Sequence, residues 1–546
     1  MNALLKWAGV LGLALCAGGI STTWGCRRPE PPRTPSGPSV RLYFMSTLAG
    51  ALEPCGCRKD MLGGADHAAA LLEQKRAEAP FELVLAAGPL LFADPELPRD
   101  RGDQDLWKAR ALASALADIG LDAWAPGVND FSAGESALGE LTRSTGAKLL
   151  AANLPNPSGL PLAATALFEV GPYRVGVVGI GARDAAEPAS DVLARSLEAA
   201  LAELRQAGAQ IQVALVSTSR GAGLRLAEKV PGFDVILLGK AAERGDANDA
   251  AFPPALIGET LVVQAPNHLQ ALAYVDLFVV GDDFSFADTA GLERVERIDS
   301  LKRQTAELER RLASYQADPA FDPKELAAVI AQLARQRSEI EHLEADKAPS
   351  GPAQSSFQYR LVEVREGAGS SSKVSQRMSE YYRQVNQHNR EAFKDRLPAQ
   401  APPGSSHYVG GAECTGCHAS ADRFWSSSQH ATAYETLSRE FKEFNLDCVG
   451  CHVTGYNRPG GSTVTHVEKL TDVQCEACHG AGSRHVESGG DTELITLAPA
   501  QSVCRSCHHA PHVVDDWDAA AALRKVVGPG HGLPLIPKPP PAATKP

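Results

Sequence analysis

Methionine is scarce in this chain, and its absence from the C-terminal part limits the chemistry available there. The four methionines among the 546 residues are Met1, Met45, Met61 and Met378. No thioether sulfur is therefore available as a metal ligand after residue 378. Basic residues are not in excess either, since the net charge is -12, and a nucleic-acid partner would require a basic face. Nucleic acid is thus excluded as a partner, whereas a cationic redox protein is permitted.

The apolar run near the N-terminus is short. It extends from Ala8 to Ala17, follows Lys6 and is followed by small polar residues, which predicts an export signal and not a membrane span. The next stretch, Thr23-Trp24-Gly25-Cys26, resembles a bacterial lipoprotein signal, although it lacks the usual Leu three places before the cysteine. We expect a signal peptide over residues 1–26, a lipid on Cys26 that anchors the protein to a membrane, and a proline-rich tether over 27–39. Cleavage by the ordinary signal peptidase is the alternative.

Length and composition describe a globular protein of several parts. A chain of 546 residues is too long for one ordinary core, so two or three domains are expected. Its 44% hydrophobic and 22% charged residues are typical of folded proteins.

Cysteine is concentrated in four C-x-x-C-H runs near the C-terminal end. Chance would give roughly 0.01 such runs in a chain of this length and composition. The run is the attachment signature of a c-type haem, because two thiols add to the haem vinyl groups and the histidine reaches the iron. A zinc cluster also uses C-x-x-C pairs but needs no histidine after each. We therefore predict four covalent haems, attached through Cys414, Cys417, Cys448, Cys451, Cys475, Cys478, Cys504 and Cys507, with proximal ligands His418, His452, His479 and His508.

Histidine is the available ligand for the other side of each iron. Eleven of the chain's 15 histidines lie at or after residue 407, and seven of them are outside the four runs: His407, His430, His466, His485, His509, His512 and His531. Without methionine, each sixth position must hold a histidine, an unusual donor or nothing. Two histidines on one iron give low reduction potentials. So short a segment must use the haems themselves as its core, and closely spaced haems favour electron transfer.

Further residues around these runs carry a family resemblance. They are Tyr408, Gly410, Trp425, Ser428-Gln429-His430-Ala431, Cys475 to Gly480, Gly482 and His485. Over about residues 400–531 the sequence resembles the tetrahaem cytochrome c-554 family, which shuttles electrons in the periplasm. The resemblance implies that His430 and His485 are distal ligands, that His531 is a third with His512 as its rival, and that one haem is five-coordinate.

Residues 40–290 alternate strand-like and helix-like stretches, which predicts an α/β sheet architecture. The expected strands are Arg41–Ser46, Glu82–Ala87, Lys148–Asn153, Arg174–Ile180, Gln212–Ser217, Asp234–Leu238, Leu261–Gln264 and Ala271–Val280. Short motifs include Ala86-Ala87-Gly88-Pro89, Gly127-Val128-Asn129-Asp130-Phe131 and Ile236-Leu237-Leu238-Gly239-Lys240. Their order resembles the metallophosphatase sandwich of periplasmic 5'-nucleotidases.

That resemblance fails at the metal ligands. Where the family has Asp, Asn and His ligands, this chain has Thr47-Leu48-Ala49, Pro89, Val128, Thr218 and Lys240-Ala241-Ala242. Most of these side chains cannot hold two divalent ions or an activated water. We expect a retained fold with a dead active site, and nucleotide hydrolysis is a remote alternative.

Two cysteines lie in the first loop of this region. Cys55 and Cys57 are one residue apart, with His67 nearby in sequence. The Glu53-Pro54-Cys55-Gly56-Cys57 loop resembles that of nucleotidase-like domains fused to multihaem cytochromes. It could be a redox or metal site, or a structural pair whose strained disulfide would be reducible.

The remaining segments complete a multidomain organisation. The α/β domain covers residues 40–296, and leucine and isoleucine at helical spacing predict a helical hairpin over 297–346, either a spacer arm or a dimerisation surface. A strand and a helix then close the fold over 347–397. A linker at 398–406 leads to a mainly α-helical and irregular tetrahaem domain at 407–533 and a proline-rich tail at 534–546.

The sequence therefore predicts an exported multihaem cytochrome of the periplasm or cell envelope. It would transfer electrons to and from redox partner proteins, with the α/β domain as a scaffold or docking module. The alternative is a redox enzyme that uses a five-coordinate haem on a small nitrogen or sulfur compound.

Overall fold

The computed structural model describes residues 37–54, 61–155, 160–184, 190–245, 247–288, 291–317, 323–345, 354–509, 517–528 and 531. The predictions for the signal peptide, Cys26, Cys55, Cys57, His512 and the tail concern residues outside these ranges. Among the described residues, no helix combines the length and the apolar character needed to cross a membrane.

The first sheet of the α/β part is mixed and has eight strands in the order β13-β14-β12-β1-β2-β3-β4-β5. From β1 to β5 the neighbours are parallel, whereas β12 is antiparallel to both β1 and β14. The bounds are β1 Val40–Ser46, β2 Glu82–Ala87, β3 Ala123–Ala125, β4 Lys148–Leu150, β5 Leu162–Ala163, β12 Ala271–Phe278, β13 Ala287–Asp288 and β14 Ser356–Glu363.

The second sheet has six strands in the order β10-β11-β9-β8-β7-β6. Its central strands β7, β8, β9 and β11 are parallel, and an antiparallel strand closes each edge. The bounds are β6 Thr165–Val170, β7 Tyr173–Ile180, β8 Ile211–Ser217, β9 Val235–Gly239, β10 Ala255–Ile257 and β11 Thr260–Val263.

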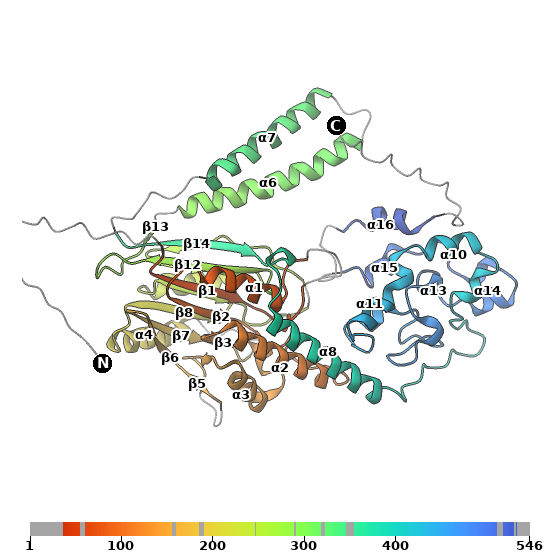
Figure 1. Ribbon diagram of the computed structural model, residues 1–546, viewed down its shortest axis with the longest axis horizontal. Helices are drawn as coiled ribbons and strands as arrows, with labels where there is room; N and C mark the ends of the chain where they lie inside the picture. The colour runs from red at the N-terminus through yellow and green to blue at the C-terminus, as the bar shows by residue number, and fades with distance from the viewer. Residues whose placement is uncertain are drawn as a thin grey trace, which may run out of the picture.

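The two sheets pack face to face, and helices cover their outer faces (Figure 1). Alternation along β1 shows why: Leu42 and Phe44 face the second sheet, whereas Tyr43 and Met45 face the helices. The first sheet is covered by α1 Ala65–Arg76, α2 Gly102–Ile119, α3 Gly134–Thr145 and α8 Ser372–Ala392, and the second by α4 Ser190–Gln206 and α5 Arg220–Lys229. The predicted α/β class is confirmed.

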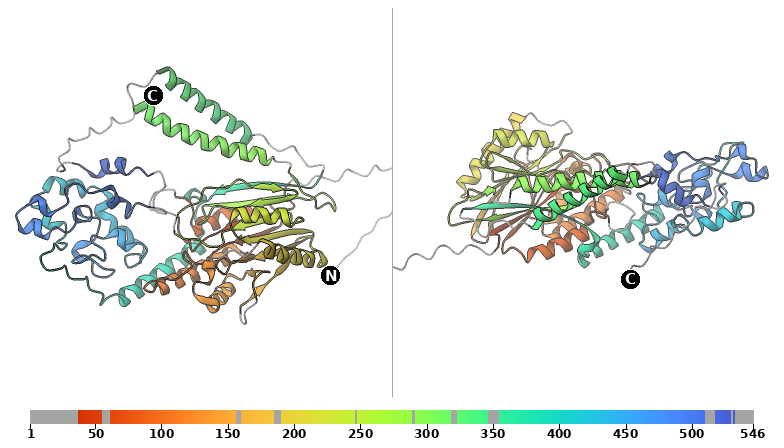
Figure 2. Two further views of the ribbon diagram at one scale, coloured as in Figure 1. Left: turned by 180° about the vertical axis from the view of Figure 1, so that it is seen from behind. Right: turned by 90° about the horizontal axis from the view of Figure 1, so that it is seen from above.

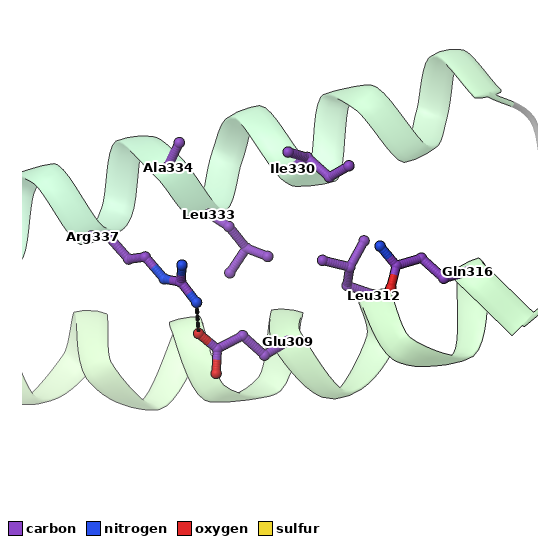
Figure 3. Close-up of a pocket in the computed structure, with 7 residues that line it drawn as sticks. All are labelled: Glu309, Leu312, Gln316, Ile330, Leu333, Ala334 and Arg337. Atoms are coloured by element: carbon purple, nitrogen blue, oxygen red, sulfur yellow. Dashed lines mark hydrogen bonds and ion pairs between the residues drawn. The ribbon is translucent and has the colours of Figure 1, made fainter. Parts of the chain in front are cut away.

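The predicted helical hairpin consists of α6 Leu292–Ala317 and α7 Pro323–Ala345. The two helices run side by side, away from the sheets (Figures 1 and 2). Leu312 and Leu333 face each other between them, and Arg337 pairs with Glu309 at 2.7 Å (Figure 3).

The C-terminal part contains short helices joined by turns, at the end of the molecule to which α8 leads (Figures 1 and 2). Its α-helices are α9 Ala412–Thr415, α10 Ala419–Trp425, α11 Ala433–Arg439, α12 Val449–His452, α13 Cys475–His479, α14 Ser483–Glu487, α15 Gln501–Arg505 and α16 Ala519–Val526. The 3-10 turns of the described chain are η1 Val128–Phe131, η2 Glu366–Ala368, η3 Gln429–Thr432, η4 Glu468–Leu470 and η5 Thr492–Leu494.

Candidate functional site

Each C-x-x-C-H run lies on or beside one of these short helices. In the first run the backbone N–H of His418 donates to the carbonyl of Cys414 at 2.9 Å, and in the fourth His508 donates to Cys504 at the same distance. One helical turn therefore separates the first cysteine from the histidine. Cysteines three residues apart then share one face of the turn with that histidine.

Three of the four run histidines lie against a second histidine. The ring centroids of His418 and His485 are 6.3 Å apart, and their planes meet at 23°. The centroids of His479 and His531 are 6.4 Å apart with planes at 21°. Each pair joins residues that are far apart in the sequence, so the fold and not the local chain brings them together.

The fourth run shows the same arrangement at a steeper angle. The ring of His508 lies 6.2 Å from that of His430, with planes at 49°, and stacks on Trp517 at 4.7 Å. Burial lowers the pKa of both histidines, which favours the neutral imidazole that a metal binds. Sequence reasoning missed Trp517, because an isolated tryptophan gives no signal of what it covers.

His452 differs from the other three. In the part of the chain that the structure describes, no second histidine ring is paired with it. Its Nδ1 lies 2.6 Å from the carbonyl oxygen of Ala433 and 3.5 Å from the hydroxyl of Thr436. An Nδ1–H that donates to the carbonyl leaves the lone pair on Nε2, the form required of a metal ligand.

The same backbone anchor recurs at two other candidate ligands. The Nδ1 of His479 lies 2.6 Å from the carbonyl of Thr496, and that of His485 lies 2.9 Å from the carbonyl of Asp491. His466 instead contacts the hydroxyls of Thr463 and Thr465, at 3.4 and 3.2 Å. His466 is therefore placed among hydroxyl groups and not opposite a run histidine.

The attachment cysteines of different runs approach one another. The thiol of Cys414 lies close to that of Cys475, which brings the first and third runs together. The thiol of Cys507 lies close to that of Cys451, which brings the fourth and second runs together. The four runs are thus arranged as two close pairs.

A buried carboxylate ties the start of this part to the third run. Glu476 is 2% exposed, and its oxygens accept the backbone N–H of Val409, Gly410 and Gly482 at 2.8 to 3.1 Å. Such charge-assisted bonds are among the stronger protein hydrogen bonds. Glu476 is a structural residue whose role its position inside a C-x-x-C run did not reveal.

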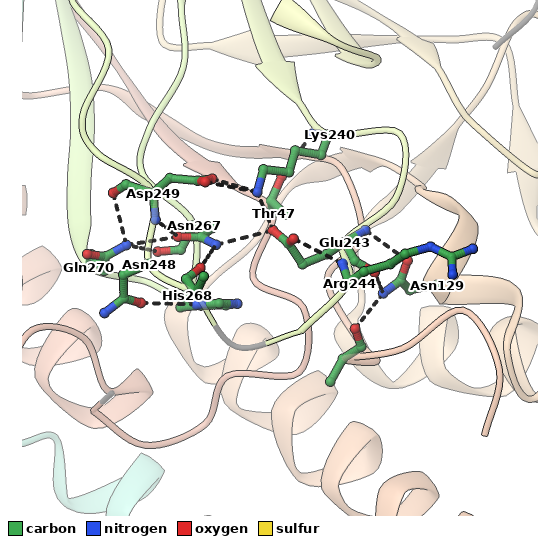
Figure 4. A network of polar contacts seen from close by, with 12 residues as sticks. Thr47, Asn129, Lys240, Glu243, Arg244, Asn248, Asp249, Asn267, His268 and Gln270 are labelled. Atoms are coloured by element: carbon green, nitrogen blue, oxygen red, sulfur yellow. Dashed lines mark hydrogen bonds and ion pairs between the residues drawn. The ribbon is translucent and has the colours of Figure 1, made fainter. Parts of the chain in front are cut away.

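The α/β part holds a polar network at the ends of strands β1 and β9, where the sequence predicted a dead metal site (Figure 4). The Nζ of Lys240 lies 2.6 Å from Glu243 and 2.8 Å from Asp249, and its backbone N–H donates to the Thr47 hydroxyl at 2.9 Å. Asn129 is fully buried and donates to three backbone carbonyls. A single ammonium group thus pairs with two carboxylates of this network.

The backbone around the network is strained. Thr47, Ala49, His268 and Leu269 all have φ near +50°, a backbone conformation that residues other than glycine rarely adopt. Among the described residues, no three His, Cys, Asp or Glu side chains are grouped so as to hold a metal ion. His67 contacts the carbonyl of Gly369 at 2.5 Å, and its suggested partners Cys55 and Cys57 lie outside the described residues.

The C-terminal part matches a known protein family. Residues 413–480 match the family model of cytochrome c554 and c-prime. The chain is also 34% identical over 102 residues to cytochrome c-554 of Nitrosomonas europaea, a match that covers 16% of this chain and 41% of that protein. The predicted resemblance of this segment to the cytochrome c-554 family is confirmed.

The α/β part is similar to solved structures of nucleotidases and related hydrolases. A 5'-nucleotidase precursor from Thermus thermophilus has a TM-score of 0.40 and 16% identity, over 66% of this chain and 61% of that one. A calcineurin-like phosphoesterase, YfkN from Bacillus subtilis, has a TM-score of 0.36 and 14% identity, over 56% of this chain and 98% of that one.

The described residues fit haem iron. Imidazole–metal bonds of about 2 Å place the centroids of two imidazoles that share one metal roughly 6 Å apart. The three histidine pairs, at 6.2 to 6.4 Å, have that separation. Each pair also contains one histidine from a C-x-x-C-H run.

Proposed function

We propose that this protein is an envelope electron-transfer protein with four c-type haems, one at each C-x-x-C-H run. The histidine pairs carry the proposal, because three separate run histidines have a second imidazole at the distance of a shared iron. The haem would supply one-electron chemistry when bound. The chain would supply the ligands: His418 with His485, His508 with His430, and His479 with His531.

Close pairing of the runs supports transfer between haems. The thiol contacts of Cys414 with Cys475 and of Cys451 with Cys507 bring haem-bearing segments together in pairs. Groups so close can pass an electron without a mobile carrier. We further propose export to the periplasm, a lipid anchor at Cys26 and a redox protein as partner, in agreement with the sequence.

The test is a haem count with ligand assignment. In the exported protein we expect the mass of four haems, three low-spin irons and one that binds carbon monoxide. A colourless protein with no added mass would refute the proposal. Four low-spin irons would instead assign His512, or another donor, to the haem of the second run.

A second candidate function follows from His452. If its iron has an open position, a small nitrogen or sulfur compound could bind there and be reduced or oxidised. Turnover of nitrite or hydroxylamine by the purified protein, lost with His452→Ala, would favour this enzyme. Absence of carbon monoxide binding would remove its site.

A further inference from the structure

The segment that precedes the second C-x-x-C-H run, residues 442–447, is held by side chains of the α/β part. We call it the docking segment. It ends directly before Cys448, to which a haem would be joined. It lies against the start of α2 and the end of α8, two helices that cover the first sheet. The contacts around it are denser than a flexible linker between domains would make.

Gln104 of α2 is the centre of these contacts. This side chain is only 2% exposed, and its Nε2 donates to Asn445 at 3.2 Å and to Asp447 at 3.3 Å. Its Oε1 accepts the backbone N–H of Leu446 at 3.1 Å and the Nδ2 of Asn389 at 3.0 Å. One buried amide thus satisfies groups from both parts of the chain.

Helix α8 holds the same segment from its other side. Asn389, also 2% exposed, donates to the carbonyl of Phe444 at 2.8 Å. Asn386 donates to Glu443 at 3.0 Å and accepts the backbone N–H of Phe444 at 3.2 Å. These bonds fix the backbone of the segment as well as its side chains.

Three ion pairs complete the contacts. Asp447 lies 3.0 Å from Nη1 of Arg101 and 3.7 Å from Nζ of Lys108. At the other end, Lys442 pairs with Glu53 at 2.5 Å, and its ammonium lies 4.4 Å from the ring centroid of Tyr382. The charges next to the second run are therefore set by residues of the α/β part.

Cys448 is close enough to these charged groups to be affected by them electrostatically. Burial, together with the negative charges of Asp447 and Glu53, raises the pKa of its thiol to about 12. A haem joined to this sulfur would have the same neighbours. Burial and nearby charge are two of the means by which a protein sets a haem potential.

We propose that the α/β part positions the haem attached at Cys448 and Cys451. Gln104 and Arg101 are the positioning residues. They hold the docking segment and keep Asp447 neutralised, so that this haem has a potential distinct from those of the other three. The inference rests on the proposed function, and it gives the α/β part a redox role without a catalytic site of its own.

The test is Arg101→Met in the full, haem-loaded protein, compared with Arg101→Lys. Loss of the guanidinium leaves the negative charge of Asp447 less compensated, which favours the ferric state of a nearby haem. In a spectroelectrochemical titration we expect one of four components to lose about tenfold in its reduced-to-oxidised ratio at a fixed potential, or ~59 mV for one electron. The potentials of the other three components should not change. In Arg101→Lys the fourth potential should be close to that of the unaltered protein, because the positive charge is retained.

Arg110→Met is the matched control. Arg110 lies on α2, the helix that begins directly after Arg101, and pairs with Glu140 at 3.1 Å on the exposed surface, away from the docking segment. It should leave all four components unchanged. Gln104→Leu, which removes the central amide, should shift the same component as Arg101→Met.

Each outcome decides between the two proposals. Unchanged potentials in both Arg101→Met and Gln104→Leu would overturn the inference while leaving the haem count intact. An equal shift of all four components would also overturn it, because it would indicate a general change of fold. Absence of haem from the unaltered protein would refute the proposed function itself.

Discussion

The imidazole rings of His418 and His485 lie 6.3 Å apart and within 23° of parallel, although one belongs to the first C-x-x-C-H run and the other follows the third. Histidines from two distant segments would therefore bind one iron. Each proposed iron would therefore be a crosslink of the C-terminal part as well as a redox group.

Replacement of His485 by alanine should open one iron. In His485→Ala, the iron that we propose His418 holds should lose its second imidazole and change from low to high spin. Carbon monoxide binding should rise by one haem per chain, measured by optical difference spectra, with a matching high-spin signal in electron-paramagnetic resonance. The proximal attachment should persist, because both thioethers remain.

His466→Ala is the control for this variant. Within the described part of the chain, His466 contacts threonine hydroxyls and is not paired with a run histidine ring. Its loss should change neither carbon monoxide binding nor the spin-state ratio. If His485→Ala behaves like His466→Ala, the proposed pairing with His418 is wrong.

Replacement of His531 by methionine should raise one potential. The ring of His531 lies 6.4 Å from that of His479, and histidine–methionine ligation gives higher potentials than two histidines. In His531→Met we expect one component of the redox titration to move up by an amount on the order of 0.1 V. A titration identical to that of the unaltered protein would show that this side chain does not reach the iron.

Removal of the Lys240 ammonium should destabilise the α/β part. Lys240→Met leaves Glu243, whose side chain is only 8% exposed, without its cation. Unpairing of a largely buried charge should cost about 1–3 kcal/mol. The free energy of unfolding, followed in urea by hydrogen exchange of β9, is the measurement.

Lys229→Met is the matched control for Lys240→Met. Lys229 pairs with Asp191 on the exposed surface, with side chains 43% and 75% exposed. Its loss should leave the free energy of unfolding nearly unchanged, because solvent screens an exposed pair. Equal effects of the two variants would argue against a special role for the buried network.

The α/β part should lose stability as pH rises toward neutrality. Asp130 is fully buried, and burial raises its pKa from 3.8 to about 7, although three backbone N–H groups partly counter this. The folded state thus binds this proton more tightly than the unfolded state does. Its contribution is complete below pH ~4 and is lost as pH rises through ~7.

Asp130→Asn tests this dependence. The variant cannot titrate, so its free energy of unfolding should change less between pH 5 and pH 8 than that of the unaltered protein. Part of the slope should remain, because burial raises the pKa of Asp234 to about 7 as well. An unchanged slope would show that Asp130 is already ionised at pH 5.

Strands with long apolar runs were predictable from the sequence. The runs at Glu82–Ala87 and Arg174–Ile180 form β2 and β7 nearly as expected, because a strand buried on both faces has no polar alternation. The run at Lys148–Asn153 stops early, at Leu150. The cause is Asn153. Its side-chain amide donates to the carbonyl of Gly181 and accepts the backbone N–H of Gly181, and this turns the chain out of the sheet. Short strands such as β3, with three residues, gave no signal.

The C-x-x-C-H runs are recognisable in the sequence because the pattern is local, whereas the partner of each run histidine depends on the fold. The sequence supplied His430, His485 and His531 as candidates through a resemblance, but no spacing rule assigns each to its run. The contacts of Gln104 and Asn389 were invisible for a similar reason. Both are polar residues on amphipathic helices, where a solvent-exposed position is the ordinary expectation.

The helical hairpin departs from the sheet and returns to it at neighbouring points. Ala287, near the end of β13, pairs directly with Ser356, the first residue of β14. The hairpin is therefore an insertion between two strands that are neighbours in the sheet, and it does not affect the strand order. It can be shortened, exchanged or deleted without changing the connectivity of the two sheets. This makes it a suitable site for a fluorescent or affinity insert.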